Sequence, residues 1–345
     1  MLARYMARRA LASIPVVIGV SLITFLLMHA TVGSYVPGLS LNPNLNPKDV
    51  ERLKEALGLD RPLYVQYLDW FGLAWIMEKI GLGFLLAGAH NFGTGLIEGN
   101  FGLSMTDQTA VTAQVMDRLP NTLLLSSVAI VIGVLVAVPA GVVGSLRRGS
   151  RLDHFLTFVS VAGVAIPQFW LALILILFFS VKFHDWGLPF LPSGGVATPF
   201  SGGDLLDRLA HLIMPAIVLS FVYVAIWSRY TRSSMVEVLA QDYVRTARAK
   251  GMSSRRVVYL HALRNAIIPL VTLIGLELPG LFSGGLVVEA VFGWPGIGLM
   301  TYQRALAYDY TTVLGVVTFA AILVVAGNLL ADLLYAVLDP RIRYT

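Results

Sequence analysis

Long runs of uncharged residues constrain this chain more than any other feature. Leu119 to Leu146 contains 28 residues without a charge, and Phe155 to Val181 contains 27 more. The short turn between them carries Arg147, Arg148 and Arg151. A helix needs about 20 predominantly apolar residues to cross the hydrocarbon core of a bilayer. The two runs therefore predict a hairpin of membrane-spanning helices with a basic turn.

Four further apolar stretches are long enough for the same role. They are Ala10–Met28, Leu209–Ser228, Asn265–Gly293 and Thr311–Ala331. The first is longer than the apolar core of a usual secretory signal and has no clear small-residue cleavage site after it, which favours a retained helix over a cleaved signal. With 57% hydrophobic and 13% charged residues and a mean hydropathy of +0.75, we expect an all-α polytopic membrane protein with six transmembrane helices.

The distribution of charge predicts the orientation of these helices. If both termini are cytoplasmic, the inside segments carry 16 basic and 4 acidic residues, whereas the outside segments carry 9 basic and 13 acidic residues. Basic residues concentrate on the cytoplasmic side of membrane proteins. The asymmetry therefore favours six spans in a cell membrane, with both termini and the basic loop 229–266 inside.

Residues 31–118 differ in composition and form the expected extracytoplasmic segment. Asn46, Pro47 and Gly58 bracket a predicted short helix, with a cap, a proline at the first position and a glycine stop. The apolar stretches within Trp70–Ile97 are interrupted by charge and are too short to span. We expect them to form an interfacial or partner-facing insertion rather than a seventh span. The predicted organisation is thus residues 1–30, residues 31–118 and a core of five spans in residues 119–345.

Several kinds of chemistry have no sequence signature here. The chain has no cysteine and contains no GxxxxGK[ST] phosphate loop, HExxH or GxSxG motif. The six histidines are scattered without metal-ligand spacing, so no metal site is expected. A membrane-embedded enzyme is therefore the weaker hypothesis.

One polar segment, Gln241–Pro269, separates two of the apolar stretches. Val236 to Lys250 is rich in helix formers and places Leu239, Tyr243 and Ala247 on one face, and Gly251 then predicts a helix stop. Ser253 or Ser254 would cap a second helix. This helix–glycine–helix pattern predicts a compact knob, in which the small side chains of Ala247 and Ala249 allow close docking of a partner. On charge alone, the segment could equally be a solvated loop or a patch that binds anionic lipid.

The spacing around Gly251 resembles the EAA loop of ATP-binding-cassette importer permeases. That consensus reads Glu-Ala-Ala, three residues, Gly, nine residues, then Ile-x-Leu-Pro. Gly251, Ala247 and Leu263 match it, while Arg245, Thr246, His261 and Arg264 depart from it.

The departures resemble the peptide-type branch of these permeases, specifically the subunit with the longer outside segment. DYVRTARAKGMS and HALRNAIIP carry this likeness in the loop. Further motifs extend it along the chain: LGLDRPLYVQY (57–67), RLPNTLLL (118–125), IPQFW (166–170), EAVFGWPGIG (289–298) and NLLADLLYAVLDPRIR (328–343). Residues 71–99 look like an insertion relative to the family.

The resemblance implies a type I ABC importer permease fold and a set of partners. These are a second homologous permease, two cytoplasmic ATPases that hold ATP and Mg²⁺, an extracytoplasmic substrate-binding protein and the lipid bilayer, with no nucleic acid and no cofactor bound by this chain. Its knob would couple to an ATPase. The expected coupling residues are Tyr243, Arg245, Ala247, Arg248, Ala249, Lys250, Gly251, His261, Arg264 and Asn265.

Two acidic residues in or near the fifth apolar stretch, Glu277 and Glu289, are candidates for the translocation path. A carboxylate in a membrane costs at least about 2.5 kcal/mol on insertion scales, so each should face a pore or a partner. Glu277 could meet a peptide's ammonium group, and a hydrogen bond to the partner permease is an equally good interpretation.

Three functions remain open from the sequence. The first is an ATP-driven importer permease for dipeptides or oligopeptides, or for another solute such as nickel. The second is a stand-alone secondary carrier, although no internal repeat or relay of intramembrane ionisable residues is evident. The third is a membrane scaffold or lipid-binding protein.

Overall fold

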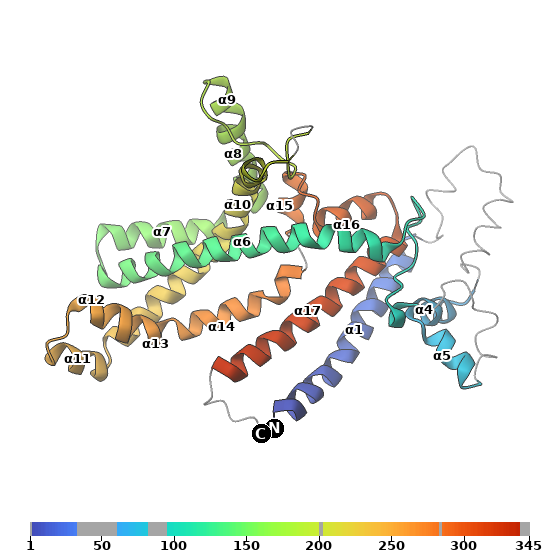
Figure 1. Cartoon of the computed structure of the whole chain (residues 1–345), viewed down its shortest axis with the longest axis horizontal. Coiled ribbons are helices and arrows are strands. Elements are labelled where there is room, and N and C mark those ends of the chain that lie inside the picture. The colour runs from blue at the N-terminus through green and yellow to red at the C-terminus, as the bar shows by residue number, and fades with distance from the viewer. Residues whose placement is uncertain (1, 33–60, 82–94, 200–202, 283–284, 339–345) are drawn as a thin grey trace. The chain divides into compact units, whose positions relative to one another are not determined.

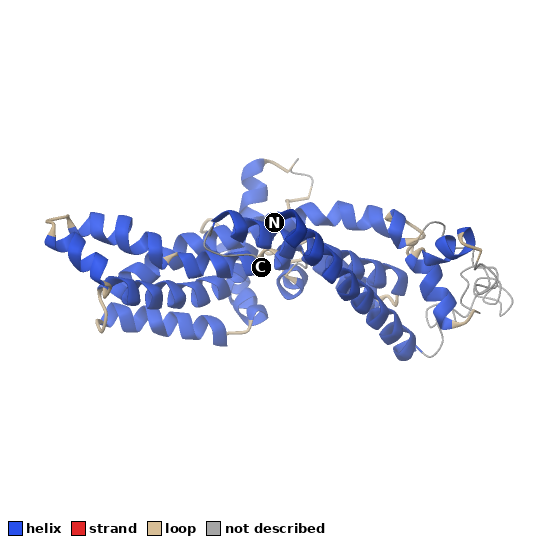
Figure 2. Cartoon of the chain, turned by 90° about the horizontal axis from the view of Figure 1, so that it is seen from below, coloured by secondary structure: helices blue, strands red, loops and turns tan. Residues whose placement is uncertain are grey.

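The structure is a computed structural model, which describes residues 2–32, 61–81, 95–199, 203–282 and 285–338 (Figure 1). Helices make up most of the described chain (Figure 2). Within those ranges, a single antiparallel bridge between Leu103 and Ala110 is the only β pairing. The predicted all-α class is confirmed.

The helices have the following bounds. They are α1 (Leu2–Val32), α4 (Leu63–Phe71), α5 (Leu73–Lys79), the 3₁₀ turn η2 (Leu96–Glu98), α6 (Val111–Leu146), α7 (Arg151–Ala165), α8 (Gln168–Leu175), the π-helix η3 (Ile176–Lys182), α9 (Phe183–Asp185), α10 (Leu205–Leu239), α11 (Asp242–Ala249), α12 (Ser254–Arg256), the π-helix η4 (Val257–Leu263), α13 (Arg264–Ala266), α14 (Ile268–Glu277), the 3₁₀ turn η5 (Pro279–Phe282), α15 (Leu286–Val291), α16 (Ile297–Leu306) and α17 (Tyr310–Leu338).

Five stretches of the described residues are long and apolar enough to cross a membrane. They are Met6–Leu27, Val111–Leu146, Gln168–Asp185, Leu205–Leu239 and Tyr310–Asp332. A sixth is formed if the pair Ser254–Ala266 and Ile268–Leu281, which is bent by 45°, counts as one span. These spans agree with the predicted six, while the orientation of the termini stays a prediction.

Two of the predicted spans are interrupted. The stretch 155–181 breaks at Ile166, whose extended backbone precedes Pro167, so α7 ends at Ala165 and α8 begins at Gln168. A residue before proline disfavours the helical conformation, which accounts for the break. The stretch 265–293 is likewise not one helix, because α14 ends at Glu277 and α15 is a separate short helix.

The predicted extracytoplasmic segment is described only in part. The expected helix between Asn46 and Gly58 lies outside the described residues. Within the expected insertion, α5 has 7 residues and α4 just before it has 9, and neither is long enough to span.

The chain forms two compact units, each with its own packing. The first comprises the described parts of residues 1–120 and 300–329. In it, Tyr67 on α4 contacts α1 through a 2.8 Å hydrogen bond with Ser21, and the Phe101 ring packs edge-on against Phe319.

The second unit comprises residues 121–299 with the end of α17, and α10 is its central helix. Three glycines allow close approach to α10. A Cβ built on Gly133 would lie 2.9 Å from Trp227, one on Gly141 would lie 2.6 Å from Thr231, and one on Gly163 would lie 2.7 Å from Ala225. Small residues at helix contacts let backbones pack closely, which drives association of helices in membranes. The contacts therefore hold α6 and α7 tightly against α10.

The glycine contacts give a prediction about stability. Gly141→Ala places a methyl group against Thr231 and the Ser228 carbonyl oxygen, and overpacking of this kind costs about 1–3 kcal/mol. We expect a lower melting temperature in detergent, measured by the temperature dependence of tryptophan fluorescence. Gly19→Ala in α1 is the matched control, since nothing lies within 4 Å of a Cβ there. Equal melting temperatures for the two variants would contradict the close-packing interpretation.

Candidate functional site

The helix–glycine–helix segment follows directly from the end of α10. The predicted continuous helix from Val236 to Lys250 is wrong in one respect, because α10 ends at Leu239 and extended Gln241 precedes α11. Asp242 lies in the first turn of α11 and Arg248 in the last, where each charge matches the helix dipole. Figure 1 shows α11 and α12 together at one end of their unit, beyond the ends of α6 and α7.

Gly251 ends α11 as predicted. Its φ is +76°, in the left-handed region, and no atom lies within 4 Å of a Cβ built on it. Its N–H donates to the Arg248 carbonyl oxygen at 2.9 Å. Glycine is therefore required here by backbone conformation and not by lack of space.

The second arm of the segment runs from Ser254 through η4 to Ala266. Ser253 occupies the predicted capping position, but its side chain makes no capping hydrogen bond. The π-helix η4 occupies the middle of the arm, and π-helical turns occur frequently at functional sites. We call the body formed by residues 242–266 the knob.

The knob has its own apolar core and a firm attachment. Val244, Ala247 and Val257 are buried together between its two arms. A neighbouring cluster joins the second arm to α10 and α6 through buried Val258, Met235 and Val142 among others. Burial of this apolar area fixes the knob to α10 rather than leaving it a mobile loop.

A hydrogen bond also joins the two arms at the surface. The Asn265 amide donates to the Tyr243 hydroxyl at 3.1 Å and to the His261 carbonyl oxygen at 2.9 Å. Tyr243 is thus turned outward, not into the face predicted for it with Ala247.

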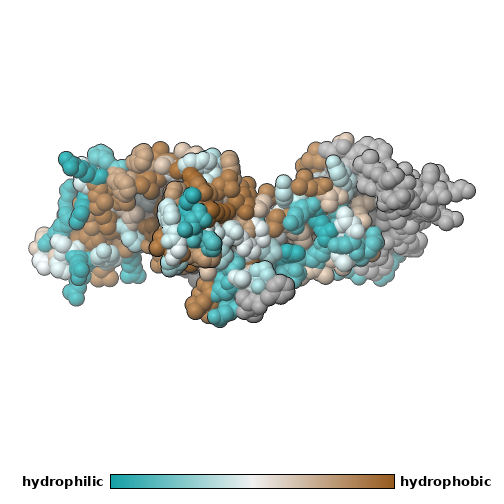
Figure 3. Space-filling model, turned by 90° about the horizontal axis from the view of Figure 1, so that it is seen from above, coloured by the Kyte–Doolittle hydropathy of each residue, from teal (hydrophilic) through white to brown (hydrophobic). Residues whose placement is uncertain are grey.

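The expected coupling residues lie together, and most are exposed. The exposed ones are Tyr243, Arg245, Arg248, Ala249, Lys250, Gly251, Arg264 and Asn265. Figure 3 shows hydrophilic side chains gathered at the end of the unit where α11 lies, beside a hydrophobic surface. Ala247 instead packs inward and is buried between the arms, so its predicted part in coupling would act through the knob's core. His261 is half-buried, and its Nε2 has no hydrogen-bond partner among the described residues.

Glu289 does not lie open to a translocation path in this structure. It is fully buried, accepts hydrogen bonds from the Thr122 hydroxyl at 3.0 Å and from the Leu299 N–H at 2.9 Å, and lies against Gly296 and Gly298. A Cβ built on Gly296 would come within 2.5 Å of its carboxylate. Gly296 and Gly298 of GWPGIG thus let the turn close over a buried carboxylate, and a role for Glu289 in the translocation path stays a prediction.

Glu277 differs from Glu289. It is half-buried at the end of α14, and no described residue makes a hydrogen bond or ion pair with it. Its placement therefore leaves the carboxylate available to a group outside this chain.

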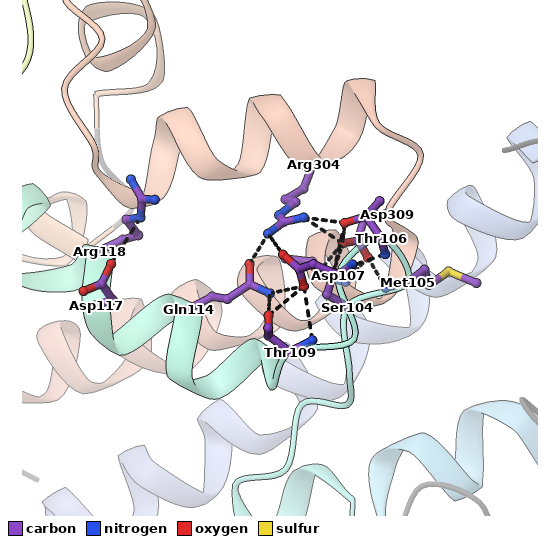
Figure 4. Close-up of polar contacts among 11 residues, drawn as sticks. Ser104, Met105, Thr106, Asp107, Thr109, Gln114, Asp117, Arg118, Arg304 and Asp309 are labelled. Atoms are coloured by element: carbon purple, nitrogen blue, oxygen red, sulfur yellow. Dashed lines mark hydrogen bonds and ion pairs between the residues drawn. The ribbon is translucent and has the colours of Figure 1, made fainter.

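The sequence reasoning missed a buried polar corner in the first unit (Figure 4). Asp309 is fully buried and accepts hydrogen bonds from Ser104, Thr106 and Thr312 and from the Met105 N–H. It also accepts from the Thr312 N–H and so caps α17. An Asp just before an apolar run is a capping signal that could have identified it.

Arg304 on α16 closes the same corner. Its guanidinium donates to Asp107 at 2.5 Å, to Gln114 at 2.8 Å and to Thr106. A hollow of about 310 Å³ beside it is lined by Gln114, Asp117, Arg118, Met300, Gln303, Arg304 and Ala307. This corner fixes the segment after η2 to the start of α17.

The comparisons with known proteins agree with this geometry. Residues 129–344 match the family described as binding-protein-dependent transport system inner membrane component, and residues 1–126 match the N-terminal membrane component of the same systems. The chain belongs to this family of permease subunits. It is therefore a multi-pass protein of the inner membrane, with the type I importer permease fold.

Several relatives match this chain over nearly their full length, and their names describe peptide permeases. The chain is 41% identical to the oligopeptide transport system permease protein AppB of Bacillus subtilis, with 99% of this chain and 100% of the relative covered. It is 38% identical to the di/tripeptide permease DppB of Pseudomonas aeruginosa (99% of this chain, 98% of the relative) and 35% identical to the dipeptide permease DppB of Escherichia coli K12 (99% of each).

The Asp309 corner gives a prediction about pH. Burial alone would raise the pKa of the Asp309 carboxyl, but hydrogen bonds from Ser104, Met105 and Thr312 outweigh it and hold the pKa below its usual range. This stabilisation is therefore present above the unfolded-state pKa of about 3.9 and is lost as pH falls through the lower folded-state pKa. We expect Asp309→Asn to lower the melting temperature at neutral pH and to reduce its fall on acidification.

Asp117→Asn is the control, because the Asp117 side chain is 79% exposed. It should leave both the melting temperature and its pH dependence near wild type. An Asp309→Asn protein with wild-type pH dependence would contradict the assignment.

Proposed function

We propose that this chain is the permease subunit of an ATP-driven importer that moves dipeptides or oligopeptides into the cytoplasm. The observation that carries the proposal is the knob, a helix–glycine–helix body that packs on α10. Its outer face is exposed and basic. The peptide substrate is taken from the names of full-length relatives.

The partners follow from the class of transporter. The chain pairs with a second homologous permease, two cytoplasmic ATPases and an extracytoplasmic substrate-binding protein. ATP and Mg²⁺ bind the ATPases, and this chain binds no cofactor. A cytoplasmic knob and cytoplasmic termini are supported by the positive-inside rule, because the segments on that side of the predicted topology carry 16 basic and 4 acidic residues.

The knob transmits the ATPase movement. It sits in a cleft on an ATPase subunit through Tyr243, Arg245, Arg248, Ala249 and Lys250, with Arg264 and Asn265 on the second arm. Closure of the ATPases on nucleotide then displaces the knob. α10 moves with it because it shares the apolar clusters of the knob, and α14 moves with it because it follows directly from the second arm. This is a rigid element with two positions that links two distant sites.

Glu277 is the candidate substrate contact on the path. A carboxylate that has no hydrogen-bond or ion-pair partner among the described residues, in an apolar helix, is suited to a peptide's ammonium group. A hydrogen bond to the partner permease is the alternative role.

A transport assay separates this proposal from its alternatives. The chain is reconstituted in liposomes with its second permease, ATPases and binding protein, and accumulation of a labelled dipeptide is measured with and without ATP. We expect ATP-dependent accumulation that unlabelled dipeptide suppresses and Ni²⁺ does not. Accumulation of nickel without accumulation of dipeptide would contradict the peptide substrate. Peptide uptake by this chain without the ATPases would show that it is a secondary carrier.

Gly251→Val tests the coupling role in the same assay. Valine disfavours the φ of +76°, so the turn between the two arms should distort. We expect at least a tenfold loss of ATP-dependent uptake, on the order of the coupling energies between distant sites. Gly187→Val is the matched control, since Gly187 has a φ of +66° and open space around it, far from the knob in sequence. Wild-type uptake by Gly251→Val with normal ATPase binding would contradict the coupling role.

A further inference from the structure

A partly buried ion pair joins α7 to α10 before the start of the knob, and neither of its residues belongs to the coupling segment predicted from sequence spacing. The Arg232 guanidinium on α10 donates from Nε to Asp153 at 2.5 Å and from a terminal nitrogen at 2.7 Å. The Asp153 side chain is only 3% exposed and that of Arg232 is 33% exposed. A two-point contact of this kind fixes orientation as well as distance.

The pair is built by three elements. Asp153 lies in the first turn of α7, where Ser150 caps the helix and the Gly149 N–H donates to the Asp153 carboxylate at 2.9 Å. A Cβ built on Gly144 of α6 would lie 3.4 Å from both partners. Arg232 and the Gly149 N–H lower the pKa of Asp153 to about 2, so the carboxylate is charged throughout the physiological range.

The position of the pair along α10 connects it to the knob. Arg232 lies about two helical turns before the end of α10. Met235, one turn further on, is fully buried in the cluster that contains Val142 of α6 and Val258 of the knob's second arm. Along α10, the ion pair therefore lies one helical turn before the apolar cluster that holds the knob.

We propose that Asp153 and Arg232 are positioning residues for transport, which make α7 move as one body with α10 and the knob. The inference rests on the proposed function, because it assigns the pair a role in passing ATPase movement to the spans. Apolar contacts between helices tolerate small sliding, whereas a buried carboxylate held at two points by a guanidinium does not. Without the pair, α10 follows the knob while α7 lags behind it.

The test uses Arg232→Lys in the complete reconstituted complex. Lysine keeps the charge but cannot make the two-point contact. The readouts are the rate of ATP hydrolysis, the rate of labelled dipeptide uptake and their ratio. We expect hydrolysis to persist and uptake per ATP to fall on the order of tenfold, within the range of coupling between distant sites.

Two further variants make the test specific. Asp153→Asn should lower the ratio similarly, and the double variant should be no worse than either single variant, as for residues that act as a unit. Arg148→Gln, an exposed residue of the same turn, is the control and should keep the wild-type ratio.

Each outcome decides the matter. If the ratio of uptake to ATP hydrolysis is unchanged, even when both rates fall, the pair is only structural and the inference is overturned. If Asp153→Asn fails to fold, the milder Arg232→Lys variant still supplies the ratio. If the wild-type complex itself does not import peptide, the proposed function fails instead.

Discussion

The close packing of α6 and α7 against α10 is the constraint on which the second unit depends. Gly133, Gly141 and Gly163 leave room for the α10 side chains to reach the neighbouring backbones, and the hydroxyls of Ser160 and Ser228 add a 2.9 Å hydrogen bond between α7 and α10. Lipid gives helices little hydrophobic reason to associate, so close fit and buried polar contacts must supply the attraction. These contacts hold the three helices together, and in the proposed role the two-point contact between Asp153 and Arg232 removes the remaining freedom of α7 to slide.

The knob is attached to this three-helix body, so a force on the knob would be passed to the helices. Its two arms enclose Val244, Ala247 and Val257, and its second arm packs on α10 and α6 through Met235 and Val142. Gly251 turns the chain between the arms at no steric cost. In the proposed function a separate ATPase supplies the energy, and this requires a small, rigid surface that is continuous with the spans it moves.

Much of this architecture could be predicted from the sequence, for physical reasons that are local. Length and hydropathy identify spans such as 119–146, and a glycine after a helical run identifies the stop at Gly251 because only glycine takes its φ freely. The rest depends on tertiary contacts. The inward turn of Ala247, the burial of Glu289 under GWPGIG and the Asp153–Arg232 pair, 79 residues apart, follow from which helices pack together. The break at Pro167 had a local signal, since the residue before a proline avoids the helical region.

The knob and the body formed by α6, α7 and α10 are expected to move together. This chain has no cysteine, so it can be spin-labelled before assembly only at two introduced cysteines, which replace exposed His154 of α7 and exposed Ser254 of the knob. The measurement is the distance between these labels by electron–electron double resonance in the complete complex, with and without trapped nucleotide. We expect one narrow distance distribution that nucleotide leaves unchanged. A shift or a second population on nucleotide binding would contradict it.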